Sequence, residues 1–205
     1  MLGIKSWINL NSSSVFFKGT RIATDAYGKD LLVSLYRKYI NGYPKFFKMD
    51  PLSRLGFVAC ELLFNSEKVE TLQTDNLNED SCLILFNKSA SLANDKIYNE
   101  TIDNENYFPS PSVFVYTLPN IVTGEIAIKN KIYGETSFYV IDELDATTIF
   151  NVVSSSMSDT NNNRCICGWL ECSNEDNFNA ILLMIDKTSD TLFNIENLRN
   201  ILNYK

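Results

Sequence analysis

The residues of this chain with types and spacing suited to chemistry are cysteines and carboxylates, because the chain contains no histidine. Nucleophile systems that use an imidazole as general base are therefore excluded, as are metal sites built on imidazole. The remaining candidates fall into two groups that lie close together in the sequence: Cys165, Cys167 and Cys172, and Asp142, Glu143 and Asp145.

The cysteine group is interpreted as structural. Residues two apart on a strand share a face, so Cys165 and Cys167 are placed to hold one side of a metal. A structural zinc site needs four cysteine or histidine ligands, however, and this region supplies three. Buried, apolar cysteines are the favoured interpretation, and we predict no metal and no cofactor. The acidic group is interpreted as a solvated turn before a helix.

Composition and charge limit the classes of partner that this chain can bind. The 205 residues are 45% hydrophobic and carry a formal charge of −7, which is typical of one globular domain, here residues 1–205. The negative charge disfavours nucleic acid and anionic membrane as partners. No apolar run approaches the roughly 18 residues of a membrane span, and the N-terminus resembles a strand and not a signal peptide. An odd number of cysteines, five, favours a reducing compartment, so we expect the cytoplasm.

Strands and helices alternate along the chain. Apolar runs predict strands at residues 2–9, 13–23, 81–86, 136–141, 165–172 and 180–186, the last two joined as a hairpin. Helices are predicted from residue 51 onward and at 89–102, 113–132, 146–156 and 194–203, with loops at 36–47, 65–80 and 103–112. This alternation predicts an α/β fold with a mixed, mainly parallel sheet flanked by helices.

Two helix boundaries carry specific signals. Asp50 is placed as an N-cap, and Pro51 follows it at the first helical position. Gly134 is predicted to end the helix at 113–132. The helix after Pro51 has one apolar face, formed by Leu52, Leu55, Val58, Ala59, Leu62 and Leu63.

Three stretches with fixed order and spacing carry recognisable motifs. Residues 48–56 read Lys-Met-Asp-Pro-Leu-Ser-Arg-Leu-Gly, and residues 110–114 and 118–128 read Ser-Pro-Ser-Val-Phe and Leu-Pro-Asn-Ile-Val-Thr-Gly-Glu-Ile-Ala-Ile. Gly134 and Glu135 then lead into the strand at 136–141. Together they resemble the N-terminal half of β-ketoacyl synthases, in the thiolase-like superfamily. The resemblance spans residues 45–186, including the hairpin strands, and implies a thiolase-like half.

The chain departs from that family where the chemistry is done. The resemblance places the nucleophile at or beside Glu143, where the sequence reads Ile-Asp-Glu-Leu and has no cysteine. The family's two catalytic histidines come from its C-terminal half, and this chain has none. A carboxylate is a poor acceptor of an acyl group from a thioester, whereas a thiolate is a competent one. We therefore expect no catalytic residues and no condensation by this chain alone.

Short chains of this kind resemble the chain-length-factor subunits of bacterial aryl-polyene and flexirubin pathways. That resemblance implies a heterodimer with a full-length ketosynthase, whose acyl or polyene tunnel this chain shapes. Acyl carrier protein is acidic, so its docking is expected mainly through the partner. The strand at 136–141 would pair across the subunit interface, and Phe114 and Tyr116 would limit chain length. The implied interface and tunnel residues are Phe114, Tyr116, Asn120, Thr136, Phe138, Tyr139, Val140 and Glu143.

Other interpretations stay open. The strand at 136–141 also has the pattern of a central core strand, and Glu143 that of an ordinary solvated carboxylate. A stand-alone enzyme using Glu143 or a cysteine on an acyl thioester is one alternative function. A self-associating acyl-binding protein is another. Because the family's sheet is completed by a second half, we also expect an exposed apolar face.

Overall fold

A computed structural model describes residues 1–67, 80–102, 108–159 and 161–204. Its strands are β1 (Gly3–Asn11), β2 (Ser14–Phe17), β3 (Thr20–Ile22), β4 (Ser81–Asn87), β5 (Thr136–Val140), β6 (Arg164–Asn174) and β7 (Asn177–Asp186). Its α-helices are α1 (Gly28–Leu35), α2 (Pro51–Glu67), α3 (Leu92–Asn99), α4 (Pro111–Phe114), α5 (Ile121–Asn130), α6 (Ala146–Met157) and α7 (Ile195–Leu202). A π-helical turn η1 (Tyr36–Ile40) and two 3-10 turns, η2 (Pro44–Lys48) and η3 (Val115–Thr117), complete the elements.

The strands form one mixed sheet in the order β3-β2-β1-β7-β6-β4-β5. Only β6-β4 and β4-β5 pair in parallel, and the other four pairs among the described strands are antiparallel. The α/β class with a mixed sheet is confirmed, but the expected predominance of parallel pairing is wrong. The physical reason is the short turns after β1 and β6, since a connection of two residues permits only an antiparallel pair.

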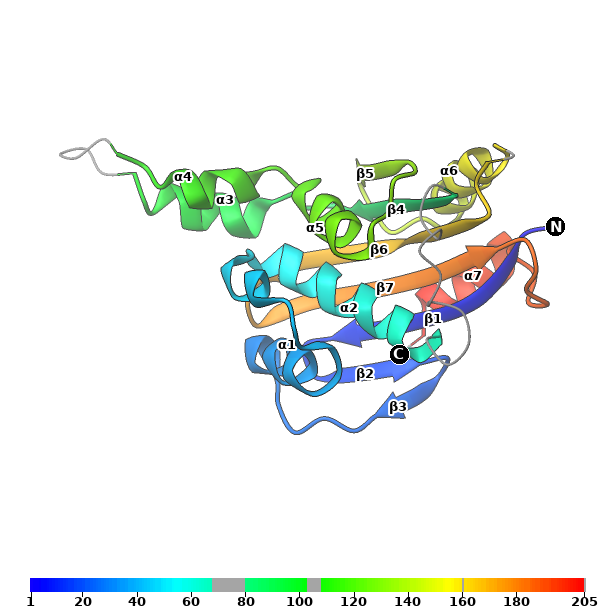
Figure 1. Ribbon diagram of the computed structural model, residues 1–205, viewed down its shortest axis with the longest axis horizontal. Coiled ribbons are helices and arrows are strands. Elements are labelled where there is room, and N and C mark those ends of the chain that lie inside the picture. The colour runs from blue at the N-terminus through cyan, green and yellow to red at the C-terminus, as the bar shows by residue number, and fades with distance from the viewer. Residues whose placement is uncertain (68–79, 103–107, 160, 205) are drawn as a thin grey trace.

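Helices cover both faces of the sheet (Figure 1). One core lies beneath α1, α2 and α5, and a second lies beneath α6 and α7. All seven residues of β4 are buried, as expected of a strand with apolar neighbours on both faces. Among the described residues no helix is both long and apolar enough to cross a membrane.

The expected exposed apolar face is not found on the side of α6 and α7. Their apolar side chains, including Ile149 and Leu198, point into the core. Polar side chains face outward instead, among them Glu196 and Arg199 on α7. On this side of the sheet the two helices are amphipathic and complete the second layer themselves.

The sequence signal at the start of α2 is confirmed. The backbone N–H groups of Leu52 and Ser53 each donate to the Asp50 carboxylate at 3.1 Å, so Asp50 caps α2. The helix α7 begins in the same way, because Asn197 N–H donates to the Asn194 side chain at 2.8 Å. The strand at 81–86, the helix at 146–156 and the hairpin at 165–186 are also observed within a few residues of the predicted bounds.

Several predicted boundaries are wrong. The helix at 113–132 is broken into α4, η3 and α5, and it ends at Lys131 in the left-handed region (φ 52°) instead of at Gly134. The strand at 13–23 is two strands, separated by a turn with positive φ at Lys18 and Gly19. Part of the predicted loop at 36–47 is helical, and α1 was not predicted at all. Most of the predicted loop at 65–80 and half of that at 103–112 lie outside the described residues.

Gly56 allows α2 to pack closely on its neighbours. A Cβ at this position would lie 2.4 Å from Val122 Cγ2 of α5 and 2.9 Å from Leu170 Cδ2 of β6. Both distances are shorter than van der Waals contact, so a larger residue here forces these side chains or their elements to shift. Gly124 on α5 has no atom within 4 Å of such a Cβ, so the same substitution there meets open space.

We predict opposite effects for these two glycines. Gly56→Ala should lower the free energy of unfolding by about 1–3 kcal/mol through overpacking. Gly124→Ala should raise it by up to about 1 kcal/mol, because alanine has the better helix propensity. Urea denaturation followed by circular dichroism measures both. A stable Gly56→Ala protein would contradict the close packing of α2 on α5 and β6.

Candidate functional site

The strand β5 forms one edge of the sheet. It pairs in parallel with β4, from Leu83 opposite Thr136 to Asn87 opposite Val140. Among the described residues its other edge has no strand beside it. Tyr139 and Val140 leave 38% and 52% of their surface exposed. The interpretation of residues 136–141 as a central core strand is therefore wrong, since β5 is an edge strand.

The side chains of β5 divide between the two faces of the sheet. Phe138 packs against the core beneath α5. On the other face the Tyr139 ring stacks on Phe86, with ring centroids 5.2 Å apart and planes 19° apart. Stacked aromatic rings on neighbouring strands add about 0.5–1.5 kcal/mol beyond their buried area. Tyr139 is therefore held in place although its outer side is open.

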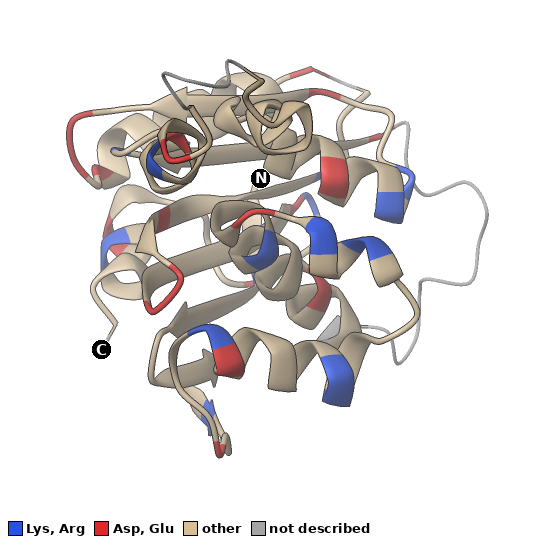
Figure 2. Cartoon of the chain, turned by 90° about the vertical axis from the view of Figure 1, so that its left-hand side faces the viewer, with Lys and Arg blue, Asp and Glu red and all other residues tan. Residues whose placement is uncertain are grey.

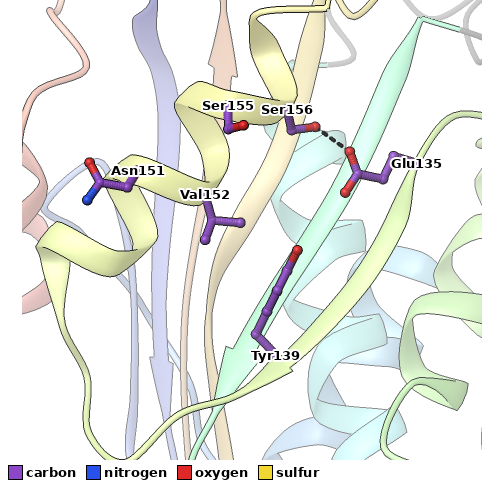
Figure 3. A pocket seen from close by; sticks show the side chains of 6 residues that line it. All are labelled: Glu135, Tyr139, Asn151, Val152, Ser155 and Ser156. Carbon is purple, nitrogen blue, oxygen red and sulfur yellow. Dashed lines mark hydrogen bonds between the residues drawn. The ribbon is translucent and has the colours of Figure 1, made fainter.

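A groove separates β5 from α6 (Figure 3). Its volume is about 370 Å³. The Ser156 hydroxyl donates to Glu135 at 2.6 Å across one end of the groove. Its lining is partly polar and partly apolar, and it comes from β5, from the residue before it and from α6: Glu135, Tyr139, Asn151, Val152, Ser155 and Ser156. The edge strand and this groove form one continuous surface, which we call the β5 face.

Glu143 lies between β5 and α6, where the nucleophile was expected by resemblance. It is exposed, as is Asp142 beside it. Asp145 instead caps α6, accepting the N–H groups of Thr147 and Thr148 at 3.1 and 2.8 Å. Hydrogen bonds from the side chain and backbone of Thr148, then from Thr147, lower the pKa of Asp145. The acidic group is thus a solvated turn before a helix, as interpreted from the sequence.

All five cysteines are free and buried. Cys165 and Cys167 face the core beneath α6 and α7, whereas Cys172 faces the opposite core, so the three do not converge. Among the described residues no cluster of histidine, cysteine or carboxylate is arranged for a metal. Burial raises the pKa of Cys172 to about 12. Cys82 differs, because hydrogen bonds with Cys165 and then Ser156 lower its pKa.

A second candidate site is a cleft at the start of α2. Its volume is about 750 Å³. Of the residues predicted to limit chain length, Tyr116 lines this cleft, but Phe114 does not. The Phe114 ring is half exposed and lies 5.4 Å from the ring of Tyr98 on α3. Asn120, also among the predicted residues, is exposed at the start of α5, and its carbonyl accepts the Thr123 hydroxyl at 2.7 Å.

Glu125, which the sequence analysis did not select, lies at the centre of a polar cluster in this cleft. It is 4% exposed. One carboxylate oxygen accepts Lys45 Nζ at 2.8 Å and the Tyr116 hydroxyl at 3.2 Å, and the other lies 3.5 Å from the Tyr43 hydroxyl. The hydrogen bond to Glu125 raises the pKa of Lys45. A usable sequence signal existed, because Glu125 sits between the buried Val122 and Ile126 on α5.

No protein-family model matches the chain, and no curated protein matches its sequence. Solved structures do match its fold. The ishigamide ketosynthase/chain length factor superposes with a TM-score of 0.66 at 13% identity, over 93% of this chain and 63% of that one. The chain has a ketosynthase-like fold.

Two further structures agree. The ketosynthase ApeO in complex with its chain length factor ApeC, from Xenorhabdus doucetiae, gives a TM-score of 0.59 at 10% identity, over 99% of this chain and 90% of that one. The type II AntDE:AntF complex of a ketosynthase with its acyl-carrier protein gives 0.56 at 10% identity, over 91% and 63%. In two of these three structures, this chain spans less than two thirds of the length of the protein it matches. The thiolase-like fold expected from the sequence motifs is confirmed.

We predict that no thiol reacts readily in the native protein. A thiolate must be accessible to act as a nucleophile, and all five side chains are enclosed. Reaction with 5,5′-dithiobis(2-nitrobenzoate) should be slow in buffer and reach five thiols in guanidinium chloride. If one thiol reacts fast, loss of that reaction in a Cys82→Ser variant would identify it as Cys82. A fast native reaction would support the alternative of a cysteine enzyme.

Proposed function

We propose that the chain is a non-catalytic chain-length-factor subunit, which pairs with a full ketosynthase through the β5 face and shapes its acyl or polyene tunnel. The observation that carries this proposal is the open edge of β5, aligned and exposed at the end of the sheet. Two features of the sequence support the non-catalytic role: the chain has no histidine, and Glu143 occupies the expected nucleophile position.

The physics of an unpaired strand edge supports pairing. Its free N–H and C=O groups form a template for another strand. Here the template is five residues long and carries two exposed apolar side chains, Tyr139 and Val140. The groove beside it offers polar side chains, including the Glu135–Ser156 pair, at the rim. A surface with an apolar centre and a polar rim is typical of protein interfaces.

The proteins with similar folds support the choice of partner. Two of them are described as a ketosynthase with its chain length factor. A third is a ketosynthase complex with an acyl-carrier protein. With a charge of −7 this chain repels an acidic carrier, so most carrier docking falls to the partner. Condensation likewise belongs to the partner, which supplies the thiolate and the histidines.

The alternative of a stand-alone thioester enzyme has less support. Glu143 is exposed, and the buried cysteines are closed to a carrier-bound substrate. A self-associating acyl-binding protein uses the same β5 edge, with a second copy as partner. The two pairings differ in the mass and composition of the complex.

We predict that Val140→Asp abolishes pairing. The chain is co-expressed with the ketosynthase encoded nearest to it, and copurification and mass are measured. A charge at this half-exposed position must be buried in the interface without a partner charge, which costs several kcal/mol. The control is Tyr27→Asp, which adds the same charge at a side chain that is 71% exposed outside the β5 face. The control variant should copurify with the ketosynthase in a one-to-one complex.

Thermal unfolding of both variants shows that they are folded. If folded Val140→Asp still copurifies, the interface is not the β5 face. If the wild-type chain ignores the ketosynthase and forms a dimer by mass, the self-associating alternative replaces the proposal.

A further inference from the structure

The cleft at the start of α2 is amphipathic. Apolar walls come from Met49, Ile97, Val113 and Val115, on elements far apart in the sequence. Its volume of about 750 Å³ lies within the range of small-molecule sites, roughly 300–1,000 Å³. Figure 2 shows the left-hand side of Figure 1, where basic and acidic residues both occur along the chain. The apolar walls suit an apolar ligand.

Polar side chains interrupt these walls. Lys48, Asp50, Arg54 and Glu175 line the cleft, with Arg54 and Glu175 3.8 Å apart, and a further polar cluster is centred on Glu125. Tyr116, Lys45 and Glu125 all line the cleft, and Lys45 and Tyr116 each bond to the Glu125 carboxylate. Because Lys45 and Glu125 form an ion pair, the charges of the cluster cancel. Burial, with Glu125 beside it, raises the pKa of Tyr116 to about 12, so the phenol stays protonated at neutral pH. The cluster is therefore neutral and in a defined protonation state.

The cluster has hydrogen-bonding capacity to spare. Tyr116 donates its hydroxyl hydrogen to Glu125, so the lone pairs of the phenol oxygen remain as acceptors. Lys45 has three N–H groups and makes one bond to Glu125, and its side chain is 48% exposed. An acceptor and donors thus lie side by side. The matching ligand group is neutral and both donates and accepts, which is the chemistry of a hydroxyl.

We propose that this cleft binds a mainly apolar acyl or polyene chain that ends in a hydroxyl group, aliphatic or phenolic, recognised by Tyr116 and Lys45. The inference deepens the proposed function, on which its choice of an acyl ligand rests. Glu125 acts through the other two as a positioning residue. A chain with a plain methyl end binds less well, because it desolvates the phenol and the ammonium without replacing their water.

The test uses the purified full chain and two probes of equal length. These are the N-acetylcysteamine thioesters of ω-hydroxydecanoic acid and decanoic acid, compared by calorimetry. We expect the hydroxyl-ended probe to bind at least about tenfold more tightly, since a site built for a hydroxyl rejects the analogue that lacks it. Tyr116→Phe keeps the ring and should reduce this preference to about threefold or less.

Two variants complete the design. Val113→Trp fills the cleft and should abolish binding of both probes. Tyr133→Phe makes the same chemical change as Tyr116→Phe at a side chain that is 72% exposed and outside the cleft, and should leave the preference intact. Equal affinity for the two probes, no binding of either, or an unchanged preference in Tyr116→Phe overturns the inference.

The outcome is independent of pairing with the ketosynthase. If the chain pairs with the ketosynthase but shows no preference between the probes, only the proposed ligand is wrong. If it shows the preference but does not pair with the ketosynthase, the proposed function is wrong and the binding site stands.

Discussion

The burial of β4 on both faces is the constraint on which the other features depend. All seven of its residues are enclosed, between α5 and α2 on one side and α6 on the other. Enclosing a strand completely requires a helical layer on each face of the sheet. The same layers fix the position of β5, which hydrogen-bonds to β4 along its whole length. The edge is therefore presented by a rigid core.

The two candidate sites differ in what they recognise. The β5 face offers the backbone groups of an edge strand together with the exposed side chains of Tyr139 and Val140, so it suits the pairing of another strand. The cleft offers side chains, and its selectivity depends on the ion pair of Glu125 and Lys45. A buried carboxylate without a partner is costly, and Lys45 and Tyr116 offset that cost. One site thus suits a protein partner and the other a small ligand.

Sequence reasoning was most reliable where a local signal decides the structure. Asp50 before Pro51 predicted the start of α2, because capping involves only neighbouring residues. The apolar run at 81–86 predicted a buried strand for the same reason. The helix α1 was missed because it begins without a side-chain cap, at Gly28 with positive φ, and is held by its packing.

The candidate site was predictable in part. The apolar run at 136–141 predicted the β5 strand, and the family resemblance suggested its interface role and that of Tyr116. Glu125 was overlooked because a charged residue on a helix is usually solvated. Its burial depends on Lys45 and Tyr43, about 80 residues away in the sequence. Likewise, the end of α5 moved from Gly134 to Lys131, since Ile132 is drawn into the core. Such long-range contacts are not visible in a local pattern.

The open edge of β5 has a consequence for how the chain is made in a cell. A strand edge that waits for a partner is a hazard whenever the partner is scarce, because surplus copies can pair with one another or with other exposed strands. On the proposed pairing, the amount of this chain must therefore match the supply of its partner.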